Sequence, residues 1–312
     1  LLLTHLYSNP GTALLLDEPD AHLEVLRQRH IYQLLTDVAG KQGSQIIAAS
    51  HSEVVLNEAA ERDIVIAFVG KPHRIDGRVS QVMKSLADLG FDQYYQAEQT
   101  GWVLYLEGAS DLAILQSFAH TLRHPAAQVL ERPFVHYITA NLPQRARDHF
   151  FGLREAKLDL VGVALFDRLD KELHRDSPLA EMMWQRREIE NYLCHEVVLL
   201  TYARQDLPDD LFGQAEADRR EADMREAINE VSVAFRTLNK PAPWSADIKA
   251  SDDFLDPLFG KYFERLGLPN LMRKSDYYVL ARLVPETLID SEVSQKLDTI
   301  VAVAQSARPR QN

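Results

Sequence analysis

The stretch WVLYLEGASD, residues 102–111, gives the clearest indication of how this chain folds. A run of apolar and aromatic residues that ends in an acidic residue and a glycine is typical of a buried strand in a parallel sheet. The following run, SDLAILQSFAHTL (110–122), predicts a helix. We expect the strand to end at Glu107, Gly108 to permit the tight turn, and Asp111 to lie in the first turn of the helix. Open α/β sheets place their sites at such strand ends.

The same alternation continues along the chain. PFVHYITA (133–140) predicts a strand, RARDHFFGLREA (145–156) a helix and LVGVALFD (160–167) another strand. The resulting βαβαβ unit is expected over 101–190. Four helical segments are predicted after residue 183: 184–205, 215–238, 257–267 and 275–285. A helical subdomain is therefore expected over 191–305, and we expect it to return to the site at the strand ends.

Residues 1–90 form a separate α/β region in this prediction. TALLLD (12–17) and SQIIAAS (44–50) are expected to be neighbouring parallel strands, joined by a helix that closes on Gly40. The runs 62–69 and 78–83 predict a hairpin, and 88–101 a connector. The predicted fold class is therefore α/β: two sheet-containing regions and an added helical subdomain.

Composition limits the function classes. The chain has 312 residues, 46% of them hydrophobic and 26% charged, and its apolar runs are too short to span a bilayer, so no membrane role is expected. Cys194 is the only cysteine, which excludes an internal disulfide and a cysteine-based zinc site, and fits a cytoplasmic location. The net charge of −12 disfavours indiscriminate coating of nucleic acid. It still allows a site where divalent metals bridge carboxylates to a phosphate.

Two motifs in the first region carry a nucleotide-binding signal. LLLDEPDAHL (14–23) ends a predicted strand with Asp17 and Glu18, and IIAASHS (46–52) places His51 after the next strand. Together they resemble the Walker B, D-loop and H-loop of ABC-type ATPases. The resemblance implies that Asp17 orders magnesium, that Glu18 polarises the attacking water and that His51 contacts the terminal phosphate. The alternative is a carboxylate pair that only caps a helix.

A second group of acidic residues follows the later strands. Their repulsion would be costly without a cation, and oxygen ligands suit Mg²⁺ or Mn²⁺. The candidate metal ligands are Glu107, Asp111, Asp167, Asp170, Glu188 and Glu190.

This arrangement resembles the Toprim domain, with Glu107-Gly108 as its Glu-Gly turn and Asp167 as the first residue of its Asp-x-Asp pattern. Leu169 stands where the second Asp is expected, and Asp170 comes one residue later. Either Asp170 reaches the metal through a shifted backbone, or a backbone carbonyl such as that of Leu169 substitutes. The third acidic group then comes from Glu188 or Glu190.

An ABC-type half followed by a Toprim unit and an ENYL segment (190–193) resembles the OLD (overcoming lysogenisation defect) family of nucleases, over roughly residues 13–283. The resemblance implies DNA cleavage with two Mg²⁺ or Mn²⁺ ions, with Glu107, Asp111, Asp167 and Lys274 as catalytic residues. Lys274 is the candidate cation beside the scissile phosphate, with Arg273 as its nearest competitor. The resemblance further implies regulation by ATP in a longer protein, a homodimer formed through a preceding region, a role in antiphage defence and a helicase partner in some relatives.

Two other functions stay open. The chain could be a regulatory or DNA-binding module that no longer cleaves, because the second Asp of Asp-x-Asp is replaced. The second is a topoisomerase- or primase-like enzyme. A topoisomerase would need a nucleophilic tyrosine, for which Tyr192 and Tyr277 are the candidates. Tyr192 lies in an apolar stripe that is more typical of a core.

The sequence predicts that this chain alone does not hydrolyse ATP. It contains no G-x-x-x-x-G-K-[ST] loop, so no cradle of main-chain N–H groups is available for the phosphates. A phosphate-release assay with Mg²⁺ and ATP should give no turnover above the rate of an Asp17→Ala, Glu18→Ala double variant. Robust hydrolysis that this variant loses would contradict the prediction.

Overall fold

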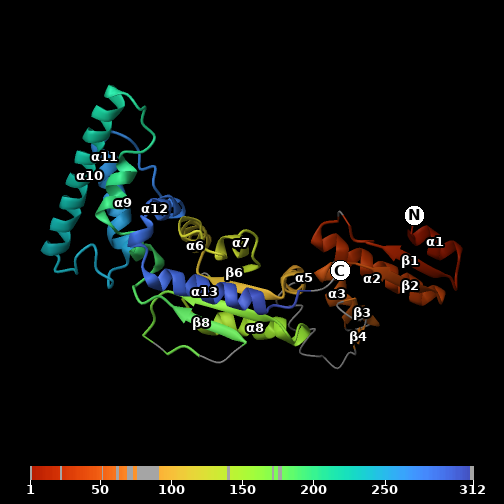
Figure 1. The fold of residues 1–312 in the computed structure, drawn as a ribbon. Coiled ribbons are helices and arrows are strands. Elements are labelled where there is room, and N and C mark those ends of the chain that lie inside the picture. The colour runs from red at the N-terminus through yellow and green to blue at the C-terminus, as the bar shows by residue number, and fades with distance from the viewer. Residues whose placement is uncertain are drawn as a thin grey trace. The chain divides into compact units, whose positions relative to one another are not determined.

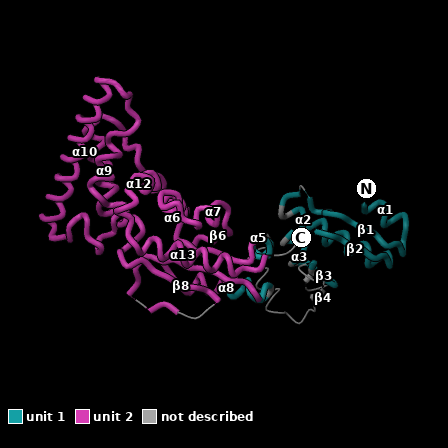
Figure 2. Tube along the Cα trace, in the orientation of Figure 1, with its two compact units in different colours: residues 1–99, 151–158, 310–312 teal, residues 100–150, 159–309 magenta. Residues whose placement is uncertain are grey.

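The computed structural model describes residues 2–309, with the exception of 22, 51, 61–62, 69–72, 76–90, 139–140, 171 and 175–177. It divides into two compact units, which Figure 2 shows in different colours. Unit 1 consists of Leu1–Gln99, Phe151–Leu158 and Arg310–Asn312, and unit 2 of Thr100–Phe150 and Asp159–Pro309.

Unit 1 is a small α/β body (Figure 1). Its elements are α1 (Leu2–Ser8), β1 (Ala13–Asp17), α2 (Val25–Gln42), β2 (Gln45–Ala49), α3 (Glu53–Ala60), β3 (Val65–Ala67), β4 (His73–Ile75) and most of α5 (Phe91–Thr100).

The two predicted strands at the start of the chain pair in parallel, as expected, with Asp17 opposite Ala49. A small core lies on one face of this pair: Leu6, Leu35, Val38 and Ala39 are buried, with Leu14, Leu16 and Ile46 packed against them. The predicted end of α2 at Gly40 is wrong. The helix continues to Gln42, because Gly43 adopts the left-handed conformation (φ 64°) that lets its N–H bond to carbonyls of the last turn.

Two further predictions for unit 1 need correction. The hairpin exists, but β3 pairs antiparallel with β4, whose residues fall in the segment predicted as its turn. The predicted second strand (78–83) lies outside the described residues. The segment predicted as a connector, 88–101, forms helix α5 from Phe91 and buries Tyr94 and Ala97, and the boundary between the two units falls near its end.

Unit 2 contains the predicted βαβαβ unit and most of the helices. Its strands and the helices between them are β5 (Trp102–Leu106), α6 (Ala109–Thr121), α7 (Ala126–Val129), β6 (Val135–Tyr137), α8 (Pro143–Ala156, up to Phe150), β7 (Val161–Phe166) and β8 (Leu179–Met183). The later elements are a 3₁₀ turn η1 (Ile189–Tyr192), α9 (Glu196–Ala203), α10 (Leu211–Thr237), a π-helical turn η2 (Ala250–Leu255), α11 (Asp256–Arg265), η3 (Lys274–Asp276), α12 (Tyr278–Leu283), η4 (Glu286–Leu288) and α13 (Ser291–Ser306).

The four strands that the structure describes in unit 2 are all parallel, in the order β6-β5-β7-β8. Both faces of this sheet are covered, as parallel sheets require. Leu104 and Leu106 point into a core shared with α6 and α13, whereas Tyr105 points to the other face and contacts His149 of α8. The carboxyl ends of β5, β7 and β8 therefore lie side by side at one edge.

The segment 184–205 was predicted to be one helix, and this is wrong. Just before this segment, Leu179–Met183 form strand β8, which the sequence prediction missed. The chain then makes the η1 turn, and only α9 is α-helical. The long helix α10 is confirmed. It begins at its cap Asp210, whose carboxylate accepts the N–H of Gly213 at 2.7 Å, and packs against α9 and α11.

No helix among the described residues is both long and apolar enough to cross a membrane.

We predict that Gly162→Ala destabilises the protein. A Cβ at Gly162 of β7 would lie 2.9 Å from Phe150 and 3.0 Å from Leu179, so the packed sheet would have to shift. Overpacking of this kind costs about 1–3 kcal/mol. Gly260→Ala in α11 is the matched control: nothing lies within 4 Å of its Cβ, and the change should stabilise by roughly 0.5–1 kcal/mol. Urea denaturation measures both, and equal stability of the two variants would contradict the prediction.

Candidate active site

The acidic pair of unit 1 lies at the end of β1, where it was predicted. Asp17 is the last residue of the strand and Glu18 follows it, and both are exposed. The Glu18 N–H donates to Ala49 O at 2.8 Å, which ties the ends of β1 and β2 together. Glu18 has a left-handed backbone (φ 43°), a strained conformation that residues other than glycine rarely adopt and that is often found at functional sites. His51 lies outside the described residues.

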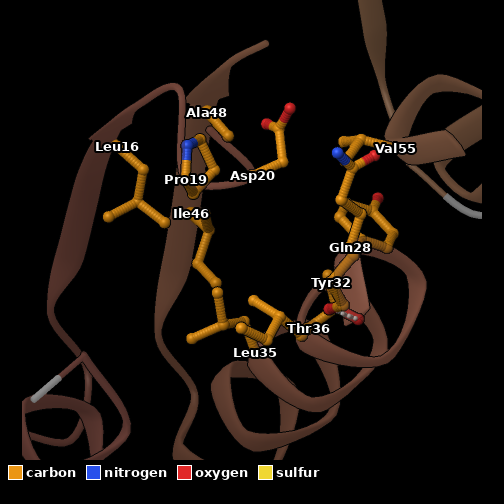
Figure 3. A pocket seen from close by; sticks show the side chains of 11 residues that line it. Leu16, Pro19, Asp20, Gln28, Tyr32, Leu35, Thr36, Ile46, Ala48 and Val55 are labelled. Atoms are coloured by element: carbon orange, nitrogen blue, oxygen red, sulfur yellow. Dashed lines mark hydrogen bonds between the residues drawn. The ribbon is translucent and has the colours of Figure 1, made fainter. Parts of the chain in front are cut away.

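Next to this pair, a cavity of about 30 Å³ lies between the strands and helix α2 (Figure 3). Leu16 and Ile46 from the strands and Tyr32 and Leu35 from α2 line it, so it is largely apolar. Asp20 is on its rim, buried, and its Oδ1 has no hydrogen-bond partner in the described part of the chain. The space suits one or two waters rather than a nucleotide.

The site of unit 2 is built at the carboxyl ends of three neighbouring strands. Glu107 follows β5, Asp167 follows β7, and Glu188 and Glu190 belong to the turn after β8. Asp167 interacts electrostatically with all three of these glutamates and with Asp111. The structure thus brings together five of the six carboxylates predicted for the metal site.

The turn after β5 is closed by Asp111 rather than by glycine. Asp111 Oδ2 accepts the N–H groups of Glu107 (3.1 Å) and Gly108 (3.3 Å). Gly108 has φ −152°, an extended conformation open to any residue, and a Cβ there would meet only Ser110 Oγ at 3.7 Å. The expectation that the turn needs Gly108 is therefore wrong.

Glu188 and Glu190 are the most buried acids of the group, with 1% and 2% of their surfaces exposed. Glu188 Oε1 accepts the N–H of Ser251, but Glu188 Oε2 has no hydrogen-bond partner among the described residues. Glu190 Oε1 likewise lacks one, and Lys274 Nζ lies 3.5 Å from it. Two buried carboxylate oxygens therefore lack a hydrogen-bond partner among the described residues, and one of them is compensated only by the nearby charge of Lys274.

Burial and mutual repulsion both favour the protonated acids. Burial, followed by the charge of Glu107 and the other carboxylates, raises the pKa of Asp167 to about 9. Burial and the Glu188 charge raise the pKa of Glu190 to about 8, against the opposing charge of Lys274. Burial also raises the pKa of Asp111 to about 6, although the Gly108 N–H opposes it. Asp167 and Glu190 therefore favour the protonated form at neutral pH unless a cation offsets their charges.

Lys274 is the cation that the fold places at this group. Burial alone would lower its pKa, but the neighbouring carboxylates of Glu190 and Glu188 raise it above its ordinary value. The lysine side chain is 45% exposed, so it both borders the acids and reaches solvent. Its competitor Arg273 is exposed and caps the η3 turn through its main chain, with its N–H donating to Asp276.

Asp170 and Leu169 differ from the five grouped acids. Asp170 is exposed and Leu169 half-buried, three and two residues beyond Asp167. No three side chains among His, Cys, Asp and Glu are placed to hold one metal ion in the described part of the chain. The five acids share one electrostatic neighbourhood without forming a closed ligand shell.

Sequence reasoning missed two residues that shape the site. Asn191, noted only as part of ENYL, accepts the Glu188 N–H at 3.0 Å and donates to Ser245 O and Ile248 O, both at 3.1 Å. Ser251 contacts both Glu188 and Lys274. The bonds of Asn191 to Ser245 and Ile248 and the contacts of Ser251 join segments far apart in sequence, so no local pattern could reveal them.

Comparison with known proteins supports the nucleotide-binding character of the first region. Residues 1–57 match a family of AAA domains whose description names the AbiEii toxin and a type IV TA system. The match includes Asp17, Glu18 and His51, and it supports an ATPase-type region at the start of the chain. No curated protein matches the chain.

We predict that stability falls as pH rises from 7 to 9 in the presence of a chelator. Asp167 and Glu190, with pKa values raised to about 9 and about 8, bind protons more tightly in the folded than in the unfolded protein. Their contribution is complete below their unfolded pKa and is lost as pH rises through the folded pKa. The lowered pKa values of His136, His149 and His195 act in the opposite direction, but only below about pH 6.5.

Urea denaturation at several pH values measures this loss. Asp167→Asn should reduce the slope between pH 7 and 9, whereas the exposed Asp209→Asn should leave it unchanged. An identical slope in the wild type and Asp167→Asn would show that Asp167 is not perturbed as described.

Proposed function

We propose that this chain is a metal-dependent endonuclease that cleaves DNA at the carboxylate cluster of unit 2, as part of an ATPase-coupled, OLD-like protein. The observation that carries the proposal is a group of five acids that interact electrostatically at a sheet edge, with Lys274 Nζ 3.5 Å from Glu190 Oε1, and with Glu188 Oε2 and Glu190 Oε1 lacking a hydrogen-bond partner among the described residues. Clusters of acids with strongly perturbed pKa values are typical of functional sites.

The donor set fits Mg²⁺ or Mn²⁺, because every candidate ligand is an oxygen atom. The residues that would hold two such ions are Glu107, Asp111, Asp167, Glu188 and Glu190, with the carbonyl of Leu169 or the carboxylate of Asp170 as further donors on the exposed side. When bound, the ions supply a hydroxide at neutral pH and stabilise the leaving oxygen of a phosphodiester.

The chain's own residues orient the acids and offset charge on the phosphate. Asp111 holds the turn after β5 and thereby fixes the main chain that carries Glu107. Lys274 presents a solvent-reachable ammonium beside the acids, where it can contact a phosphate oxygen and offset charge developed during cleavage. In this proposal unit 1 regulates cleavage through ATP, and a homodimer and a helicase partner belong to the same inference.

A non-cleaving regulatory module is the second candidate. The match of residues 1–57 to an AAA family supports an ATPase-type region but says nothing about cleavage. A topoisomerase is less well supported, because Tyr192 and Tyr277 are both almost completely buried. Burial raises the pKa of each phenol, and Tyr192 donates its hydroxyl hydrogen to Glu292.

We predict that the protein nicks and linearises supercoiled plasmid with Mn²⁺ or Mg²⁺, but not with a chelator. Glu107→Ala and Asp167→Ala should each reduce the cleavage rate at least about 100-fold, because each removes a ligand. Removing either acid also relieves repulsion, so neither variant should be less stable than the wild type in chelator. The exposed Glu286→Ala is the matched control and should cleave normally.

Each other outcome identifies a different function. Plasmid that is relaxed without nicks would indicate a topoisomerase. Plasmid unchanged with every metal, by a protein that is folded and pure, would indicate a non-cleaving module.

A further inference from the structure

The loop between α10 and α11 reaches into the carboxylate cluster through Ser251. This residue is 1% exposed and lies in the π-helical turn η2, which runs directly into α11. π-Helical turns are rare and often occur at functional sites. Asn191 anchors the start of the loop to the turn after β8 through Ser245 O and Ile248 O, so the approach of Ser251 to the acids is fixed from both ends.

The main chain of Ser251 orients one acid. Its N–H donates to Glu188 Oε1, while Glu188 Oε2 stays without a partner. A second hydrogen bond holds the main chain of the same residue: the Glu188 N–H donates to Asn191 Oδ1 at 3.0 Å. The acid is therefore held at its backbone and at one oxygen, and its other oxygen has no hydrogen-bond partner among the described residues.

The side chain of Ser251 contacts the cation. Lys274 Nζ lies 3.4 Å from Ser251 Oγ and 3.5 Å from Glu190 Oε1, so it sits between the hydroxyl and the acid. The Ser251 hydroxyl in turn donates to Asp252 Oδ1 at 3.2 Å, and Asp252 pairs with Lys249 at 2.7 Å. With its hydrogen directed at Asp252, the Ser251 oxygen offers a lone pair to Lys274.

We propose that Ser251 is a positioning residue of this site: its hydroxyl fixes Lys274 and its main-chain N–H fixes Glu188, so that one residue sets the separation between the cation and the acids. The contacts stand by themselves, and only the consequence for cleavage rests on the proposed function. A helix cap alone would not explain why the hydroxyl faces an ammonium from another segment.

Ser251→Ala tests the hydroxyl while keeping the N–H to Glu188. The first readout needs no activity: competitive acetylation of the native protein, followed by mass spectrometry, with Lys261 as the internal reference. Lys274 should react about twofold faster or more in Ser251→Ala, because neighbouring contacts couple by at least this factor. Ser251→Thr should restore the wild-type rate, and Ser117→Ala, a buried serine bonded to Ala113 O, should leave it unchanged.

The second readout is plasmid cleavage. Ser251→Ala should lower kcat about tenfold, the order of one hydrogen bond to a charged group, with KM and the half-saturating Mn²⁺ concentration within about twofold of wild type. Ser251→Thr should recover kcat. If wild type does not cleave, the proposed function fails and acetylation alone decides the role of Ser251. Unchanged acetylation of Lys274 in Ser251→Ala, or equal loss of kcat in Ser251→Ala and Ser251→Thr, would overturn the inference.

Discussion

The repulsion among buried carboxylates at one sheet edge is the constraint on which the rest of unit 2 depends. Asp167 sits centrally, interacting with Glu107, Glu188, Glu190 and Asp111. Holding such charges together costs free energy unless protons or cations compensate. The surrounding fold supplies what compensation it can: N–H groups from the β5–α6 turn and from Ser251, and the ammonium of Lys274. The helical additions are thus part of the site and not merely attached to it.

That constraint also explains the order of elements along the chain. A parallel sheet brings the ends of β5, β7 and β8 together automatically, which accounts for the acids. The cation nearest to Glu190, Lys274, comes from a segment far along the chain. Lys274 arrives only after α9, α10 and α11 have carried the chain out and back, and α12 packs against α6, whose first turn holds Asp111. The helices between β8 and Lys274 therefore bring a positive charge to the acidic edge of the sheet.

Sequence could predict the strands and helices whose signals are local. The apolar run 102–106 and the helical period after Asp111 give β5 and α6 with little ambiguity. The same reasoning failed over 184–193, where the composition looks helical. There Asn191 satisfies carbonyls up to 57 residues further along the chain, and this tertiary bonding outweighs helix propensity. The contacts of Ser251 could not be predicted for the same reason: its partners Glu188 and Lys274 are distant in sequence, and a Ser-Asp pair is most often a helix cap.

The charge balance of the site gives the strongest argument for a partner that carries positive charge. Lys274 and Lys249 bring two positive charges near five acids, and the pKa values of Asp167 and Glu190, raised to about 9 and about 8, mean that protons occupy part of the cluster at neutral pH. Protons satisfy the acids electrostatically but leave Glu188 Oε2 and Glu190 Oε1 without hydrogen-bond partners. A divalent cation would answer both demands at once, because it replaces several protons and takes up oxygen lone pairs. Binding of such a cation by Glu107, Asp111, Asp167, Glu188 and Glu190 would then release protons.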